Sequence, residues 1–164
     1  MPSTSVLTQE QLGVLKADIL ANPAFTGWNL ATSAQEVADW YNVVASPDWW
    51  VWRTLVTPRE WVDAIMGYSG AATQLDGLTA SKRDSLFWGI GYELDPSQAS
   101  VRAALDDFCG SQNTLKAAIV AEEKRKGTRA EKLFSSGTGS SASPATMTFE
   151  GSLTYQQVEA ALAS

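Results

Sequence analysis

The sequence predicts a mainly α-helical protein: a bundle of six to seven helices followed by a flexible C-terminal arm with a short β-like segment. Three observations lead to this fold class. Helix-capping motifs recur along the chain, apolar residues follow them at helical spacing, and no convincing strand pattern occurs before residue 145. With 164 residues, of which 45% are hydrophobic, the chain is long enough to bury a core.

Polar residues that can cap a helix mark each expected helix start. Thr8-Gln-Glu-Gln11 and Ser33-Ala-Gln-Glu36 are capping boxes, in which side chains satisfy free backbone N–H groups. Three more starts combine a capping residue with a proline at the first helical position, and two rest on a threonine alone: Ser46-Pro47, Thr57-Pro58, Asp95-Pro96, Thr79 and Thr154. The Ser46 start is expected to give a short helix or turn. Residues 67–78 are glycine-rich and are expected to form a loop.

One long helix is expected from about Gln112 to Phe134, interrupted by Gly127. Its segment from Lys116 to Lys132 holds six of the twelve Lys and Arg residues and three acids, a net charge of 6 − 3 = +3. The rest of the chain holds six bases and fifteen acids, or −9, and the two parts give the total of −6. A basic rod on an acidic body indicates a protein that docks onto a partner.

The composition changes after this rod, and we expect a helical body of residues 1–134 with a tethered arm of residues 135–164. Residues 135–144 are mostly small and polar, which is typical of a flexible linker. Residues 145–150 alternate polar and apolar side chains, as an extended segment does. Residues 154–163 have the pattern of a short helix.

Three large side chains of this arm are candidates for contact with a partner: Met147, Phe149 and Tyr155. Met147 and Phe149 fall on the same face of the extended segment, because side chains alternate along a strand. A strand of this length is not stable alone. We therefore expect these two side chains to pack on a receiving surface outside the helical body.

The basic run and the tryptophans supply the other candidate partner-binding residues. The basic candidates are Lys124, Arg125, Lys126 and Arg129. They can contact DNA phosphates or an acidic protein, and a solvated helix face is the alternative interpretation. Most of a cluster of six tryptophans is expected in the core: Trp40, Trp49, Trp50, Trp52, Trp61 and Trp88. Trp49 and Trp50 would point about 100° apart on a helix, so one of them is expected to meet a neighbour. Arg53 follows them and is expected to form a structural ion pair, or else to contact a neighbouring chain.

The residue types present argue against catalysis. The sequence has no His and one Cys, so zinc sites and His-dependent acid–base chemistry are not expected. Cys109 cannot form an intramolecular disulfide, which indicates a reducing compartment, and its place on an apolar stripe indicates a core residue. The GTGSS sequence at 137–141 lacks the Lys-Ser/Thr ending of a phosphate loop. We expect no enzyme activity, no metal and no cofactor.

No targeting or membrane segment is expected either. The first residues lack the basic and apolar regions of a signal peptide. The apolar runs are far shorter than the roughly 20 residues that cross a bilayer. The sequence therefore predicts a soluble protein made inside the cell.

Several blocks of the sequence are similar to proteins encoded in the genomes of tailed bacteriophages. The blocks are SPDWWVWRT (46–54), DPSQASVRAAL (95–105), KRKGTRAEKLFSSGTG (124–139) and SPATMTFEGSLTY (143–155). The resemblance covers most of the chain from Leu7 onward. It implies that the chain is a phage virion protein.

The plan of the chain also resembles phage head–tail connector (adaptor) proteins, which are small and helical and grip the portal through extended C-terminal segments. The resemblance implies a homo-oligomeric ring in the neck of the virion, made in the host bacterial cytoplasm. Its partners would be the portal protein and other neck or tail proteins, with a non-specific contact to packaged DNA and no membrane. No connector motif matches residue by residue, so no functional residue is assigned in this way. A tail-completion or minor tail protein is one alternative, and an intracellular enzyme or regulator is another.

Overall fold

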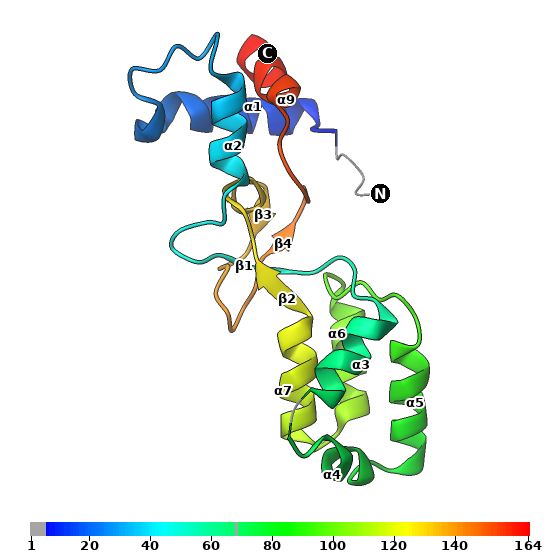
Figure 1. The fold of residues 1–164 in the computed structure, drawn as a ribbon. Helices are drawn as coiled ribbons and strands as arrows, with labels where there is room; N and C mark the ends of the chain where they lie inside the picture. Colours follow the sequence, from blue (N-terminus) through cyan, green and yellow to red (C-terminus); the bar gives the residue numbers. More distant parts are fainter. Residues whose placement is uncertain (1–5, 68) are drawn as a thin grey trace. The chain divides into compact units, whose positions relative to one another are not determined.

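The computed structural model describes residues 6–67 and 69–164 and confirms a mainly helical fold for this part of the chain (Figure 1). The elements in chain order are α1 (Gln9–Ala21), the 3₁₀ turn η1 (Pro23–Phe25), α2 (Ala34–Asn42), β1 (Trp50–Trp52), α3 (Pro58–Met66), α4 (Ala71–Asp76), α5 (Ala80–Ile90), α6 (Ala99–Cys109), α7 (Asn113–Glu122), β2 (Lys124–Lys126), α8 (Arg129–Leu133), β3 (Ser135–Ser136), β4 (Thr146–Met147) and α9 (Tyr155–Ala163). The described residues thus form nine α-helices, where six to seven were expected. The expectation about a signal peptide falls partly on residues 1–5, and the expected loop at 67–78 includes Tyr68; these residues lie outside the described ones.

The elements gather into two compact units, which are described separately. Unit 1 is the described part of Met1–Val51 together with Lys126–Ser164, and unit 2 is Trp52–Arg125. The chain leaves unit 1 in β1 and returns to it in β2, and these two strands pair. This division differs from the expected body at 1–134 and arm at 135–164. The physical reason is that the C-terminal segment packs on the N-terminal helices.

In unit 1, α9 packs against α1 and α2, and α8 packs against α2 (Figure 1). The core draws apolar side chains from both ends of the chain, among them Leu15, Ile19, Val37, Tyr41, Ala130, Phe134, Phe149, Leu153, Val158 and Ala161. Helices α1, α2 and α9 each contribute one apolar stripe, and these stripes are buried only when the three helices pack together. The two ends of the described chain therefore share one core.

The segment expected to be a tethered arm belongs to this core. Phe149 is 3% exposed, and its ring meets that of Phe134 edge-on at a centroid distance of 5.5 Å. The backbone N–H of Leu153 donates to Oδ1 of Asn42 at 2.7 Å. The receiving surface for Phe149 is thus supplied by unit 1 itself, which corrects the expectation of a docking site on a partner.

The expected linker, residues 135–144, is also held in place. Strand β3 pairs antiparallel with β4, with Ser135 opposite Met147. Trp50 of β1 donates its N–H to the carbonyl of Gly139 at 2.7 Å and accepts from the N–H of Ala145 at 2.8 Å. A serine- and glycine-rich composition therefore marks a turn fixed on β1 and not a free tether.

The expected long helix from Gln112 to Phe134 is divided into α7, β2 and α8. The Lys-Arg-Lys run is extended and pairs with β1. Thr128 then starts a new helix with its own capping box: its Oγ1 accepts from the N–H of Glu131 at 3.2 Å, and the Glu131 carboxylate accepts from the N–H of Thr128 at 2.9 Å. Pairing with a strand distant in the sequence prevails here over the helix propensity of lysine and arginine.

The other expected helix starts have mixed outcomes. The side-chain caps at Thr8, Thr57, Thr79 and Thr154 are confirmed. Ser33 precedes α2 but makes no side-chain capping bond. Ser46-Pro47 leads into β1 and not into a helix, and α6 begins at Ala99, after the Asp95 carboxylate has accepted the N–H of Ser97 at 3.0 Å. Residues 71–76, expected in a loop, form α4.

Unit 2 is a bundle of α3 to α7 with a separate core. Helices α3, α5, α6 and α7 lie side by side, and α4 lies at one end of the bundle (Figure 1). The fully buried side chains include Trp61, Ile65, Leu86, Leu105, Cys109, Leu115 and Ile119.

Cys109 is a buried core residue, as expected, and burial raises the pKa of its thiol to about 11.

Candidate partner-binding surface

Three tryptophans of unit 1 each carry a cation from the basic segment over the ring. The pairs, with the distance from the cation to the ring centre, are Arg129 on Trp40 (4.1 Å), Lys132 on Trp49 (5.1 Å) and Lys126 on Trp50 (6.0 Å). The negative face of an aromatic ring attracts a cation. We call these six residues the cation–tryptophan face.

Local structure fixes the positions of these side chains. Arg129 and Lys132 are three residues apart on α8, so they lie on the same side of the helix. Arg129 Nη1 also donates to the carbonyl of Trp40 at 2.9 Å. The indole N–H of Trp49 donates to Ser135 Oγ at 3.0 Å. The cations are therefore held on rings that are themselves anchored.

A groove with a volume of about 470 Å³ opens beside Arg129 and Lys132. Its other lining residues are Asp18, Asn22, Trp40, Tyr41, Ala45, Ser46 and Leu133. The hydroxyl of Tyr41 donates to the carboxylate of Asp18. Burial, and then this carboxylate, raise the pKa of Tyr41 above its ordinary value, so the phenol stays protonated and keeps donating.

Arg129 and Lys132 form no ion pair within residues 6–67 and 69–164, whereas the third cation of the face, Lys126, pairs with Asp48 at 2.7 Å. The groove thus combines aromatic and apolar walls with two cations that form no ion pair, and its one carboxylate, Asp18, accepts the Tyr41 hydroxyl. Such a surface suits a partner segment that presents an apolar or aromatic side chain next to an acid.

Four of the expected candidates, Trp49, Trp50, Lys126 and Arg129, take part in these cation–ring pairs. Lys126 and Trp50 pair with each other, and Trp49 and Arg129 pair with two residues that were not candidates, Lys132 and Trp40. The three-residue spacing of Arg129 and Lys132 is visible in the sequence. Their contact with Trp40 and Trp49 is not, because these tryptophans lie about 80 to 90 residues away, in the loop before β1 and in α2.

The remaining expected candidates lie elsewhere. Lys124 and Arg125 are half-buried in β2 and belong to unit 2. Met147 is half-buried in β4, and Tyr155, 43% exposed, is the first residue of α9. Phe149 is in the core and is not available to a partner.

Arg53 forms a structural ion-pair network within unit 2. Its two terminal nitrogens contact the carboxylates of Glu60 and Glu122. The backbone N–H of Thr57 and the Arg53 guanidinium hold the pKa of Glu60 at about 2, well below its usual range. The guanidinium thus has its acid partners within unit 2, as the interpretation of a structural pair predicted.

Next to this network, Glu123 is 2% exposed, and burial raises the pKa of its carboxyl from 4.5 to about 7. Asp106 raises this pKa further, while Arg102 and Lys124 oppose the rise. Between pH 4.5 and about 7 the Glu123 carboxyl is protonated in the folded protein but ionised in the unfolded chain. The free energy of unfolding therefore falls as the pH rises through this range.

We expect Glu123→Gln to remove this pH dependence, because the amide stays neutral. At pH 8 the variant should be more stable than the wild type by on the order of 3 kcal/mol, and at pH 4 the difference should vanish. Urea unfolding at a series of pH values measures this. Glu159→Gln, at an exposed carboxyl, is the control. An unchanged pH slope in Glu123→Gln would show that the buried carboxyl does not cause the effect.

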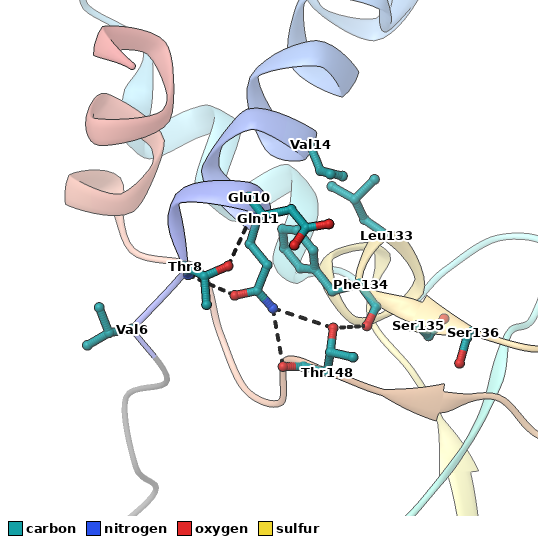
Figure 2. Close-up of a pocket in the computed structure, with 10 residues that line it drawn as sticks. All are labelled: Val6, Thr8, Glu10, Gln11, Val14, Leu133, Phe134, Ser135, Ser136 and Thr148. Atoms are coloured by element: carbon teal, nitrogen blue, oxygen red, sulfur yellow. Dashed lines mark hydrogen bonds between the residues drawn. The ribbon is translucent and has the colours of Figure 1, made fainter.

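A second groove, of about 510 Å³, lies at the N-terminus of α1 (Figure 2). Gln11 Oε1 accepts from the N–H of Thr8 at 2.9 Å, and Gln11 Nε2 donates to the carbonyl of Thr148 at 3.2 Å. Thr148 Oγ1 in turn donates to the carbonyl of Phe134 at 2.8 Å. Glu10 is the one charged residue among those that line this groove. These bonds fasten the 145–150 segment to α1, and the groove offers a partner little charge.

No family model matches the sequence, and neither a curated protein nor a solved structure matches it. Among residues 6–67 and 69–164, no group of three or more acidic or cysteine side chains is placed to hold a metal ion. In the same residues, no helix has both the length and the apolar character needed to cross a membrane.

Proposed function

We propose that this chain is a structural, non-enzymatic subunit of a tailed-bacteriophage particle, a head–tail connector that assembles as a ring at the portal. One observation carries the proposal. Sequence blocks that resemble phage proteins come from two distant parts of the chain, residues 46–54 and 124–155, and their segments 46–51, 126–139 and 143–155 meet in unit 1.

Four hydrogen bonds join these blocks: Gly127 N to Trp49 O (2.8 Å), Trp50 N to Gly139 O (2.7 Å), Ala145 N to Trp50 O (2.8 Å) and Gly151 N to Glu131 Oε1 (3.2 Å). Trp49 and Trp50 thus join the GTRAEKL, GTG and ATMTFEG segments in the strands and turns of unit 1. The DPS block belongs to unit 2.

In this proposal the cation–tryptophan face is the partner-binding surface. Residues 145–164 pack in unit 1, so a connector with this structure holds its partners through exposed surfaces and not through a free C-terminal arm. An acidic protein surface, on the portal or on a neighbouring subunit, fits the face better than DNA. The chain carries a net charge of −6, so the rest of its surface repels a continuous polyanion more than a protein segment that presents one acid beside an apolar side chain.

Stopping synthesis of the chain tests the proposal in the phage whose genome encodes it. We expect DNA-filled heads and complete tails that do not join, seen by electron microscopy of the lysate. Antibody labelling of wild-type particles should mark the neck. Normal heads with incomplete tails would instead support the tail-completion alternative. Normal infectious particles without the chain would contradict any structural role and favour a regulator or enzyme.

A further inference from the structure

Unit 2 carries a pair of large aromatic side chains at its surface. Trp88 is 71% exposed and Tyr92 is 55% exposed, and their rings meet edge-on at a centroid distance of 5.3 Å. Tryptophan and tyrosine are enriched at the energetic centres of protein interfaces, where their burial stabilises the complex. We call these two residues the aromatic ridge.

Two carboxylates flank the aromatic ridge. Asp84 lies one helical turn before Trp88, and Glu93 follows Tyr92 directly; both are exposed. Within the described residues neither carboxylate forms an ion pair, although the two bases of α5 do, Lys82 with Asp107 and Arg83 with Asp76. The ridge is therefore both aromatic and acidic.

The groove beside the cation–tryptophan face has the complementary properties. It is concave, its walls include Trp40 and Leu133, and its cations Arg129 and Lys132 have no carboxylate partner among the described residues. A volume of about 470 Å³ lies within the range of pockets that enclose ligands larger than one aromatic side chain. We infer that the aromatic ridge of a second copy of this chain occupies this groove.

The contact joins two different surfaces, so it is head-to-tail. Each copy that uses its groove still has a ridge to offer, and such contacts propagate until they close into a ring or extend as a filament. This inference rests on the proposed ring and names the contact between its subunits. The opposite charges orient the approach, and the burial of Trp88 supplies most of the affinity.

Each half of the contact can be removed by one substitution. Trp88→Ala truncates the ridge, and Lys132→Glu reverses one charge of the groove. Met66→Ala, at a 66% exposed apolar side chain in α3, is the matched control. By analytical ultracentrifugation we expect the wild type and Met66→Ala to associate as concentration rises. Trp88→Ala should weaken association about 30-fold or more.

Folding of each variant is checked by its circular dichroism and melting temperature. Asp84→Arg serves as a second ridge variant, because this side chain is exposed and its replacement is not expected to disturb the core. It should weaken association more strongly at low ionic strength than at high ionic strength. A variant that stays fully associated contradicts the contact.

Mixing two variants gives the sharpest test. Trp88→Ala keeps its groove and Lys132→Glu keeps its ridge, so a mixture of the two retains one working contact per pair of chains. We expect a one-to-one dimer and nothing larger. A wild type that remains monomeric at every concentration, or a mixture that forms no dimer, overturns the inference.

Phage particles separate this inference from the proposed function. If the chain is found in the neck and Trp88→Ala particles assemble normally, the ridge-to-groove contact is wrong while the connector role stands. If the chain associates in solution through this contact but is absent from particles, the connector role is wrong while the contact stands.

Discussion

Phe149→Ala is expected to destabilise unit 1 by about 3–5 kcal/mol, because the substitution removes a large side chain from a packed core and leaves a cavity. Phe149 is 3% exposed, and its ring packs edge-on against that of Phe134. Urea unfolding followed by far-UV circular dichroism measures the loss. The effect should include the C-terminal helix α9, since α9 packs against α1 and α2 in the same core.

Tyr155→Ala is the matched control for this prediction. Tyr155 is also a C-terminal aromatic residue, but it is 43% exposed at the start of α9. Its replacement should change the free energy of unfolding by no more than about 0.5 kcal/mol. A tethered arm would give the opposite result, with Phe149→Ala leaving the free protein unchanged and impairing only its assembly. Equal stability of the two variants would therefore restore the arm model.

The helices that the sequence predicts well are those whose signals are local. Thr8, Thr57 and Thr154 each cap a helix through a residue three positions later, so the bonding partners lie within one turn. The apolar stripes that follow are similarly local. A mainly helical fold with several correct starts follows from such signals alone.

The strands were not predictable in the same way, because their stability comes from distant residues. Lys124–Lys126 has good helix formers, and only pairing with β1, some seventy residues earlier, makes it extended. Likewise, the serine- and glycine-rich residues 135–144 have the composition of a free linker. Their bonds to Trp50 are what fix them, and composition does not report those bonds.

The contacts of the candidate surface were also not predictable, because they join residues that are distant in the sequence. Residue type alone marks the basic run and the adjacent tryptophans as binding candidates, and Lys126 does lie over Trp50, whereas Trp49 and Arg129 pair with Lys132 and Trp40, which were not among the candidates. Which cation lies on which ring depends on how α8 begins after β2. Phe149 was misplaced because an apolar residue in a short extended segment looks the same whether its receiving surface lies in its own chain or in another.

Gly139→Ala is expected to disrupt the turn on β1 and to destabilise unit 1 by several kcal/mol. Gly139 has φ = +63°, a conformation that other residues rarely adopt, and an added Cβ would lie 2.2 Å from Cδ2 of Trp49. The indole cannot withdraw easily, since its N–H is bonded to Ser135 Oγ and Lys132 lies over its ring. The clash therefore adds a steric cost to the backbone cost.

Gly151→Ala separates these two costs. Gly151 has φ = +113°, but an added Cβ would meet nothing within 4 Å, so only a backbone cost of about 1–2 kcal/mol is expected. Urea unfolding measures both variants. The double variant Gly139→Ala with Trp49→Ala should lose less stability than the sum of its single variants, because removing the indole opens the space that the new methyl group needs. If the two single effects add fully, or if Gly151→Ala is as harmful as Gly139→Ala, the close contact of Gly139 with Trp49 does not determine this turn.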